Sequence, residues 1–358
     1  MGNERAETRL LRELVEIPSP SGQEGRIAQH LVSWMDKLGY RTGIDEVGNA
    51  VGEIGDPDGP TVVLLGHMDT VPGEVPVRVE GTRLYGRGSV DAKGPLAAFV
   101  CAGARVGDII NARLVVIGAV DEERDSVGAR HAAGQYRPDA VVVGEPSGAD
   151  AVVIGYKGVL RFLVQLHRPP THSSSPEPKA VEEAVRLWQA IHGSCPVDPG
   201  SPLFDQTIPT LLSIEGDMRE ARVVVSCRTP VGFDSGAFED WLRSAVGDDN
   251  LTVLERTPAV RRPRTDPVAR ALCAAIRRAG ATPATKVKLG TADMNVVAEH
   301  WPVPTAVYGP GDSRLDHSAE EHIDLDEYLH AISVLAAALP EIAQISGMTD
   351  TRERAGHG

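Results

Sequence analysis

Short apolar runs alternate with amphipathic stretches over the first 155 residues. Residues 61–65, 114–120 and 140–143 are apolar runs, which are typical of strands buried on both faces of a sheet. Residues 4–15 and 24–38 carry apolar side chains at helical spacing, with a PSPSG turn between them. Ser21 and Glu24 fit a capping box for the second helix. This alternation predicts an α/β domain in which helices sandwich a mixed, mostly parallel sheet.

The pattern changes after residue 155. Strand-like residues 159–166, 211–215, 222–227 and 251–254 are interleaved with helical residues 179–191 and 238–246. The order β-α-β-β-α-β predicts a small open-faced α+β domain of ferredoxin-like type, with an antiparallel sheet. Helical patterns over residues 268–278 and 325–345 then resume the first domain. We expect one domain formed by residues 1–155 and 263–358, with a second domain inserted over residues 156–262.

Composition narrows the class of protein. A chain of 358 residues with 42% hydrophobic content can form two domains with buried cores. A formal net charge of −14 argues against a nucleic-acid partner. The four cysteines include no CxxC pair, which indicates free thiols in a reducing compartment. The charged N-terminus lacks the apolar core of a signal peptide. We also expect no apolar run long enough to span a membrane. These features predict a cytoplasmic protein without a membrane partner.

Acidic and histidine residues follow the predicted strands. Because the carboxyl ends of parallel strands meet at one edge of a sheet, these side chains can gather there, and together they suit a divalent metal. An acid at a strand end can instead cap the next helix, but that explanation covers single residues rather than the whole set. The set lies past three apolar strands, at the start of the helix after the glycine-rich turn and in one late loop, and consists of His67, Asp69, Asp91, Asp121, Glu122, Glu123, Glu145, Asp312, Asp316 and His317.

The glycine-rich turn at Gly86 and Gly88 has a competing interpretation as a nucleotide-binding loop. The G-x-G-x-x-G pattern requires a third glycine, and Asp91 occupies that position. We therefore expect these glycines to let the chain turn sharply beside a metal ligand.

Five stretches carry a resemblance to a known family: GHMDTVP, YGRGSVDAKG, DEE, GEPS and DHSAEE. They resemble the two-zinc aminoacylases and peptidases, which include acetylornithine deacetylase, succinyl-diaminopimelate desuccinylase and glutamate-releasing carboxypeptidase. Residues 66–99, 288–297 and 308–322 are most similar to the members that free lysine or ornithine from an amino-group carrier protein. The resemblance implies a catalytic metal-binding domain and an inserted domain that serves as a lid and in dimerisation.

The resemblance also implies two divalent metal ions, with zinc expected and cobalt as the alternative. One ion would be held by His67 and Glu145, the other by Glu123 and His317, and Asp91 would bridge them. Glu122 resembles the family's general base, and Asp69 resembles the residue that orients the imidazole of His67. The peptide bond after Asp91 is cis in the family.

Further residues match the family's substrate contacts. His172 resembles a histidine that polarises the scissile carbonyl, often from a partner subunit, which implies a homodimer; a solvated loop histidine is the alternative. Ser226 and Ala292 stand where relatives commonly have Asp and Ser. The residues expected to bind substrate are Arg228, Thr291, Asp293, Asn295 and Arg314.

These features predict a zinc-dependent amidohydrolase or peptidase of lysine or arginine biosynthesis. It would release lysine, ornithine or a related diamino acid from the γ-carboxyl of the C-terminal glutamate of an amino-group carrier protein. A deacylase of a free N-acyl amino acid is the alternative enzyme, and a non-catalytic binding relative is a more distant alternative. An acidic carrier would need a basic path on the enzyme, for which we expect Arg261, Arg262, Arg264, Lys286 and Lys288.

Overall fold

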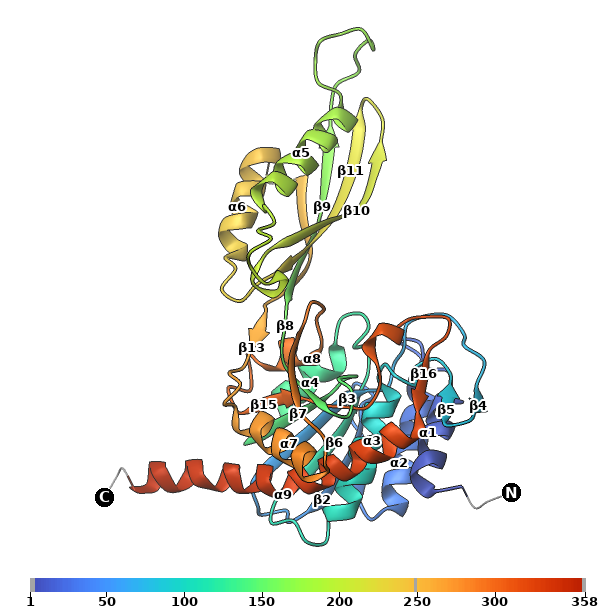
Figure 1. The fold of residues 1–358 in the computed structure, drawn as a ribbon. Coiled ribbons are helices and arrows are strands. Elements are labelled where there is room, and N and C mark those ends of the chain that lie inside the picture. Colours follow the sequence, from blue (N-terminus) through green and yellow to red (C-terminus); the bar gives the residue numbers. More distant parts are fainter. Residues whose placement is uncertain (1–3, 248–249, 356–358) are drawn as a thin grey trace. The chain divides into compact units, whose positions relative to one another are not determined.

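The computed structural model describes residues 4–247 and 250–355, which form two compact units (Figure 1). The first unit extends to Ile154 and resumes over Arg262–Lys286 and from Ala292 onward. The second unit comprises Gly155–Arg261 and Val287–Thr291. The sequence assigns residues 287–291 to the first domain, whereas the structure groups this segment with the second unit. The catalytic and lid roles of the two units stay predictions.

The first unit is built on a large mixed sheet with the strand order β1-β2-β6-β3-β7-β15-β8. Its centre is parallel, because β3 pairs with β6 and β7 in parallel, as β15 does with β7. The flanking pairs β1-β2, β2-β6 and β8-β15 are antiparallel. These strands span Arg41–Ile44 (β1), Ala50–Gly55 (β2), Thr61–His67 (β3), Arg113–Ala119 (β6), Ala140–Gly144 (β7), Ala151–Tyr156 (β8) and Thr305–Val307 (β15).

Helices cover this sheet as the apolar pattern predicts, which confirms the expected fold class. Helix α9 (Leu325–Ala355) packs on both α3 (Lys93–Val106) and α7 (Pro267–Arg278), and all three helices contact the central strands. Helix α1 (Ala6–Val15) packs on α3, and α2 (Gly25–Lys37) packs on β1 and β2. The remaining helices are α4 (Val127–Gln135), α8 (Asp293–Val297) and the short 3-10 helix Ser313–Leu315.

Short strands complete the first unit beside the sequence-predicted metal ligands. Strands β4 (Arg78–Glu80), β5 (Arg83–Tyr85) and β16 (His322–Asp324) form a small antiparallel sheet. This sheet ties residues 78–85, which precede the glycine-rich turn, to the segment after His317. Two further short strands pair with β8: β13 (Val260–Arg261), which belongs to the second unit, and β14 (Ala284–Lys288).

Helix α9 contains an apolar stretch, Leu325–Ile345, that is long and apolar enough to cross a membrane. The expectation that no run reaches this length is therefore wrong by that measure. Half of its most apolar window is buried inside the structure. Tyr328, Leu335 and Leu339 on this helix are fully buried, and the helix packs on α3 and α7. The stretch accordingly forms part of the core of the first unit.

The second unit confirms the expected β-α-β-β-α-β order. Its antiparallel sheet has the order β10-β11-β9-β12, and helices α5 and α6 pack on it. Phe162, Val223 and Leu242 are fully buried in the core between sheet and helices. The elements span Gly158–His167 (β9), Ala180–Ser194 (α5), the 3-10 helix Leu203–Asp205, Ile208–Gly216 (β10), Glu220–Thr229 (β11), Ser235–Val246 (α6) and Leu251–Thr257 (β12).

The capping box expected at Ser21 and Glu24 is wrong. The hydroxyl of Ser21 donates a hydrogen bond to Asp69 Oδ2 at 2.7 Å. The carboxylate of Glu24 accepts from the backbone N–H of Gly22 at 2.9 Å and from that of Asp121 at 3.2 Å. Both side chains are therefore directed to the ends of β3 and β6 rather than to the start of α2.

Candidate metal centre

The ends of three parallel strands bring the predicted ligands together. Strand β3 ends at His67, β7 is followed directly by Glu145, and β6 leads into Glu122 and Glu123. The register aligns Gly66 with Gly118 of β6 and with Gly144 of β7, so the three strands end at the same level. The carboxyl edge of the sheet thus places these side chains in one region.

His67, Asp91 and Glu145 form the first group that could hold a metal ion. Their ligand atoms all lie within 4.8 Å of one another. His67 Nε2 lies 3.2 Å from Asp91 Oδ1 and 3.8 Å from Glu145 Oε1. A His with two carboxylates is a donor set that suits zinc and similar divalent ions.

Asp91, Glu123 and His317 form the second group, also within 4.8 Å. His317 Nε2 lies 3.0 Å from Asp91 Oδ2 and 3.1 Å from Glu123 Oε1. Asp91 therefore belongs to both groups and presents a different oxygen to each histidine. This is the arrangement required of a carboxylate that bridges two metal ions.

The charges in this region fit two divalent cations. Burial raises the pKa of Glu145 well above its usual value, and the nearby charge of Asp91 adds to the effect. Hydrogen bonds to Asp91 and Glu123 raise the pKa of His317 to about 10. Buried carboxylates crowd together here, and metal ions would supply the positive charge that stabilises their ionised forms.

Asp69 connects the first histidine to the acidic turn after β6. His67 Nδ1 lies 3.0 Å from the backbone oxygen of Asp69 and 3.4 Å from its carboxylate. A proton on Nδ1 leaves Nε2 free to bind a metal, as expected for a residue that sets the imidazole tautomer. The same carboxylate accepts hydrogen bonds from the backbone N–H groups of Glu122 at 3.0 Å and Glu123 at 3.1 Å.

Glu122 is close to the metal groups but belongs to neither of them. Its Oε2 lies 4.0 Å from His67 Nε2. Burial raises the pKa of Glu122 well above its usual value, and the charge of Glu145 contributes in the same direction. A partly buried carboxyl beside the metal groups, but outside both of them, is suited to accept and return a proton.

Glu321, the last residue of the motif DHSAEE, is a supporting residue that the sequence pattern does not predict. Its fully buried carboxylate accepts hydrogen bonds from the backbone N–H groups of Val90 at 3.0 Å and Asp91 at 3.2 Å. It also pairs with Arg87 at 2.7 Å. The segment after His317 therefore holds the backbone of the shared ligand Asp91. The available signal was an acid directly after a ligand motif.

The glycine-rich turn adopts the sharp bend that the sequence suggests. Gly88 has a φ of +82°, a conformation that favours glycine, and a Cβ there would lie 2.7 Å from Thr70. The peptide bond between Asp91 and Ala92 is cis, as the family resemblance implies.

The predicted substrate residues are divided between the two units. Arg228 Nη1 in the second unit lies 3.2 Å from Thr291 Oγ1 in the same unit. Asp293 and Asn295 are buried in α8 of the first unit, where burial raises the pKa of Asp293 to about 7. Arg314 is exposed and pairs with Asp312 at 2.6 Å. Substrate binding by these residues stays a prediction.

His172 and the expected basic path lie among other local contacts. His172 is exposed in the loop before α5, with Nδ1 2.7 Å from Ser174 Oγ. Arg261 pairs with Asp205 at 3.1 Å, and Lys286 donates to the backbone oxygen of Ser147 at 2.9 Å. Arg262 donates to the Trp301 backbone oxygen at 3.4 Å. Arg261, Arg262 and Lys286 therefore have partners within the chain.

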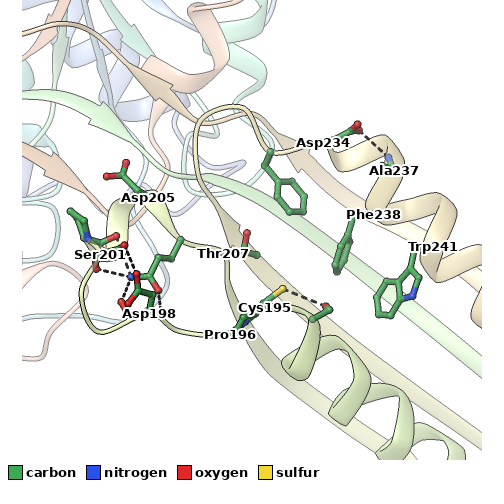
Figure 2. Close-up of a pocket in the computed structure, with 14 residues that line it drawn as sticks. Cys195, Pro196, Asp198, Ser201, Asp205, Thr207, Asp234, Ala237, Phe238 and Trp241 are labelled. Atoms are coloured by element: carbon green, nitrogen blue, oxygen red, sulfur yellow. Dashed lines mark hydrogen bonds between the residues drawn. The ribbon is translucent and has the colours of Figure 1, made fainter.

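A cavity of about 750 Å³ in the second unit is lined by Phe233, Phe238 and Trp241 (Figure 2). Its carboxylates have structural roles: Asp234 accepts from the Ala237 N–H at 2.9 Å, and Asp198 accepts from Ser201. None of the residues predicted for catalysis, metal or substrate lines the described part of this cavity.

The sequence over residues 63–341 matches Peptidase family M20/M25/M40, and the chain belongs to this family. The fold agrees, because an M20 family metallo-carboxypeptidase from Sulfolobus solfataricus superimposes with a TM-score of 0.79 at 18% identity, covering 95% of this chain and 100% of that one.

Two curated relatives are similar over almost their whole length. The [LysW]-lysine hydrolase of Deinococcus radiodurans is 44% identical over 355 residues, or 94% of this chain and 97% of the relative. The putative [LysW]-lysine/[LysW]-ornithine hydrolase of Pyrococcus abyssi is 40% identical over 337 residues, or 93% of each chain.

Proposed function

We propose that this chain is a two-zinc hydrolase that releases lysine, ornithine or a related diamino acid from an amino-group carrier protein. The scissile amide joins the α-amino group of that amino acid to the γ-carboxyl of the carrier's C-terminal glutamate. The observation that carries the metal chemistry is Asp91, whose two oxygens face His67 and His317. The carrier as substrate is supported by the two relatives, which are named as hydrolases of [LysW]-lysine and of [LysW]-lysine or [LysW]-ornithine.

The metal ligands are assigned from the two groups that share Asp91. His67 and Glu145 would hold one ion, Glu123 and His317 the other, and Asp91 would bridge them. Imidazole and carboxylate donors favour zinc among the available divalent ions, with cobalt as a competent substitute. When bound, such a pair polarises the scissile carbonyl and lowers the pKa of the attacking water.

Glu122 carries the proton in the proposed reaction. It removes a proton from the attacking water while the water oxygen forms a bond to the carbonyl carbon. It then delivers that proton to the leaving nitrogen as the C–N bond breaks. The position of Glu122, beside the metal groups without belonging to either, suits it to hold the proton between the two steps.

Several further residues are proposed to contact the substrate. Arg228 and Thr291, hydrogen-bonded to each other, would bind the carboxylate of the amino acid, because a guanidinium matches a carboxylate in geometry. Asp293, Asn295 and Arg314 remain further substrate residues in this proposal. His172 would donate a hydrogen bond to the carbonyl oxygen from the partner subunit of a cytoplasmic homodimer.

Deacylation of a free N-acyl amino acid would use the same metal site, so a direct comparison of substrates tests the proposal. The enzyme is incubated with carrier bearing lysine or ornithine, with acetylornithine and with succinyl-diaminopimelate, and the products are weighed by mass spectrometry. We expect the carrier to lose the mass of its amino acid with a kcat/KM far above that of either small substrate. Faster cleavage of a small substrate would replace the carrier with a free N-acyl amino acid.

A further inference from the structure

A groove of about 920 Å³ in the first unit adjoins the candidate metal centre. It is lined by residues from 15–23, by residues 70–77 and by Arg87, Lys93, Glu123 and Arg124, so that six charged side chains, including Glu16 and Glu74, belong to the lining. Its volume is in the range of about 300–1,000 Å³ that is usual for ligand sites. The metal chemistry described above uses only one of these side chains, Glu123.

Part of the groove wall is apolar and stiff, and the acids Glu16 and Glu74 are exposed elsewhere in the lining. Val15, Pro20 and Val75 form its deeper part, and Pro72 and Pro76 are exposed at its rim. Proline and valine lose little conformational freedom when a ligand binds, so a preformed groove of this kind costs little entropy to fill. Val77, also in the lining, is 39% exposed, and this apolar surface is open to a partner.

The position of the groove indicates which part of the substrate it receives. In the described part of the chain, Glu123 lines the groove and Glu122 does not. The leaving nitrogen must lie beside Glu122, because that residue returns the proton to it. The acyl part of the substrate is then directed to the other side of the scissile carbonyl, where Glu123 opens into the groove.

The three cations of the lining differ in what they already bind. Arg87 pairs with Glu321 at 2.7 Å and donates to the Gly73 backbone oxygen at 3.2 Å. Lys93 is buried and donates to the backbone oxygen of Ile17 at 2.8 Å. Both therefore stabilise the walls of the groove.

Arg124 is the cation of this lining that can take an anion. Its side chain is 60% exposed, and its one ion pair among the described residues is a 3.7 Å contact with Asp121, which is too long for a hydrogen bond. A Cβ at Gly22 would lie 3.7 Å from Arg124 Nη1, so the guanidinium lies against the turn at residues 18–22. Arg124 also directly follows the metal ligand Glu123 in the chain.

We propose that this groove receives the C-terminal segment of the carrier protein, and that Arg124 binds the α-carboxylate of its last glutamate. This inference rests on the proposed function. In a γ-linked substrate that α-carboxylate is free and lies a few bonds from the scissile carbonyl, at the start of the groove. The guanidinium supplies the matching charge and paired donors. An acetyl substrate carries no such group, and the groove would thereby favour a γ-glutamyl substrate.

Two short probes test the role of Arg124. Both are N-acetyl-γ-glutamyl-lysine, in which the γ-carboxyl of the glutamate is joined to the α-amino group of the lysine. One probe has the free α-carboxylate of the glutamate, and the other has an α-carboxamide in its place. We expect the wild type to prefer the carboxylate in kcat/KM by about 10- to 100-fold, as for a charged hydrogen bond. Arg124→Gln should remove this preference, keep the carboxamide rate and keep its metal content. Arg26→Gln, at an exposed arginine of α2, is the control and should retain the preference.

Several outcomes separate this inference from the proposed function. If Arg124→Gln slows both probes equally, Arg124 does not read the α-carboxylate and the inference fails while the proposed function stands. If Arg124→Gln raises KM for lysine acetylated on its α-amino group, the groove holds the leaving amino acid instead, and the inference fails. If neither γ-glutamyl probe is cleaved while acetylornithine is, the proposed function fails, and the inference fails with it.

A second variant tests the groove beyond Arg124. A longer probe carries the last six residues of the carrier and ends in the same γ-glutamyl-lysine. Val77→Asp, at an exposed position of the rim, should lower kcat/KM for the longer probe and leave the short carboxylate probe unchanged. Equal kcat/KM values of wild type and variant on the longer probe would place the carrier segment outside the groove.

Discussion

Asp91 presents its two oxygens to two different histidines, and its surroundings restrict how it can move. Oδ1 lies 3.2 Å from His67 Nε2, and Oδ2 lies 3.0 Å from His317 Nε2. Hydrogen bonds to the two histidines lower the pKa of this buried carboxyl, although burial itself acts in the opposite direction. The single residue thereby determines that two metal groups, rather than one, form at this edge of the sheet.

Glu122 and Glu123 are adjacent in sequence, and the account predicts different consequences for their loss. Glu123→Ala removes a metal ligand, so it should deplete one metal and lower kcat by orders of magnitude. Glu122→Gln removes only proton transfer, so both metals should remain while kcat falls about 10²- to 10⁴-fold. Elemental analysis together with steady-state kinetics measures both. Loss of metal from Glu122→Gln would mean that the two roles are exchanged.

Glu321 offers a second comparison at the residue scale, with its exposed neighbour Glu320 as the control. Glu321→Gln weakens the support of the Asp91 backbone and removes the pairing with Arg87. We expect weaker binding of the metals and a changed visible spectrum in cobalt-loaded enzyme, with KM little altered and kcat reduced. Glu320→Gln should behave as wild type. Identical cobalt spectra for Glu321→Gln and wild type would exclude a role in positioning Asp91.

The ligand types were predictable from sequence at this scale, whereas their supports were not. His67, Asp91 and Glu145 stand at strand ends or in recognisable motifs. The contacts of Ser21 and Glu321 involve residues distant in sequence and, for Glu321, backbone N–H groups. No local pattern reports such contacts, which is why the capping box at Ser21 was a wrong prediction.

At the scale of elements, burial on both faces determined which strands could be predicted. The apolar runs predicted β3, β6 and β7 because the centre of a parallel sheet admits few polar residues. The edge strand β1, with the sequence RTGI and a mostly exposed pattern, gave no comparable signal. Length and composition alone do not identify the role of the apolar stretch of α9, because a buried core helix and a membrane-spanning helix share both properties. Only its packing distinguishes the two.

Substitutions in the core of the second unit should lower the free energy of unfolding without changing metal binding. Phe162 on β9 is fully buried, and its ring lies 6.3 Å from that of Phe238. Phe162→Ala should lower the free energy of unfolding by about 3–5 kcal/mol through lost burial and a cavity. Arg161→Ala, at the neighbouring position on the same strand, removes only a partly exposed ion pair with Glu255 and should cost less than about 1 kcal/mol.

Two measurements check this prediction: chemical denaturation gives the free energy of unfolding of each variant, and elemental analysis gives the metal content of each folded protein. Both variants should bind metal as the wild type does, because the candidate ligands belong to the first unit. Depletion of metal by Phe162→Ala would show that the two units depend on each other for folding.

At the scale of the whole molecule, the proposed homodimer predicts that subunits can complement one another. Chains with His172→Ala and chains with Glu122→Gln should each be inactive. If His172 acts across the interface, one site in each hybrid dimer contains both residues, and full exchange restores about one quarter of wild-type activity. Activity of the mixture after verified exchange measures this. No recovery, or a fully active monomer, would leave His172 acting in its own chain or without a role.

The central claim is that one carboxylate holds two metal ions side by side, and anomalous diffraction from zinc-loaded crystals tests it most directly. The account predicts two zinc peaks about 3.5–4 Å apart with Asp91 between them. His67 and Glu145 should contact one peak, and Glu123 and His317 the other. A single peak at full zinc occupancy, or two peaks that do not share Asp91, would contradict it.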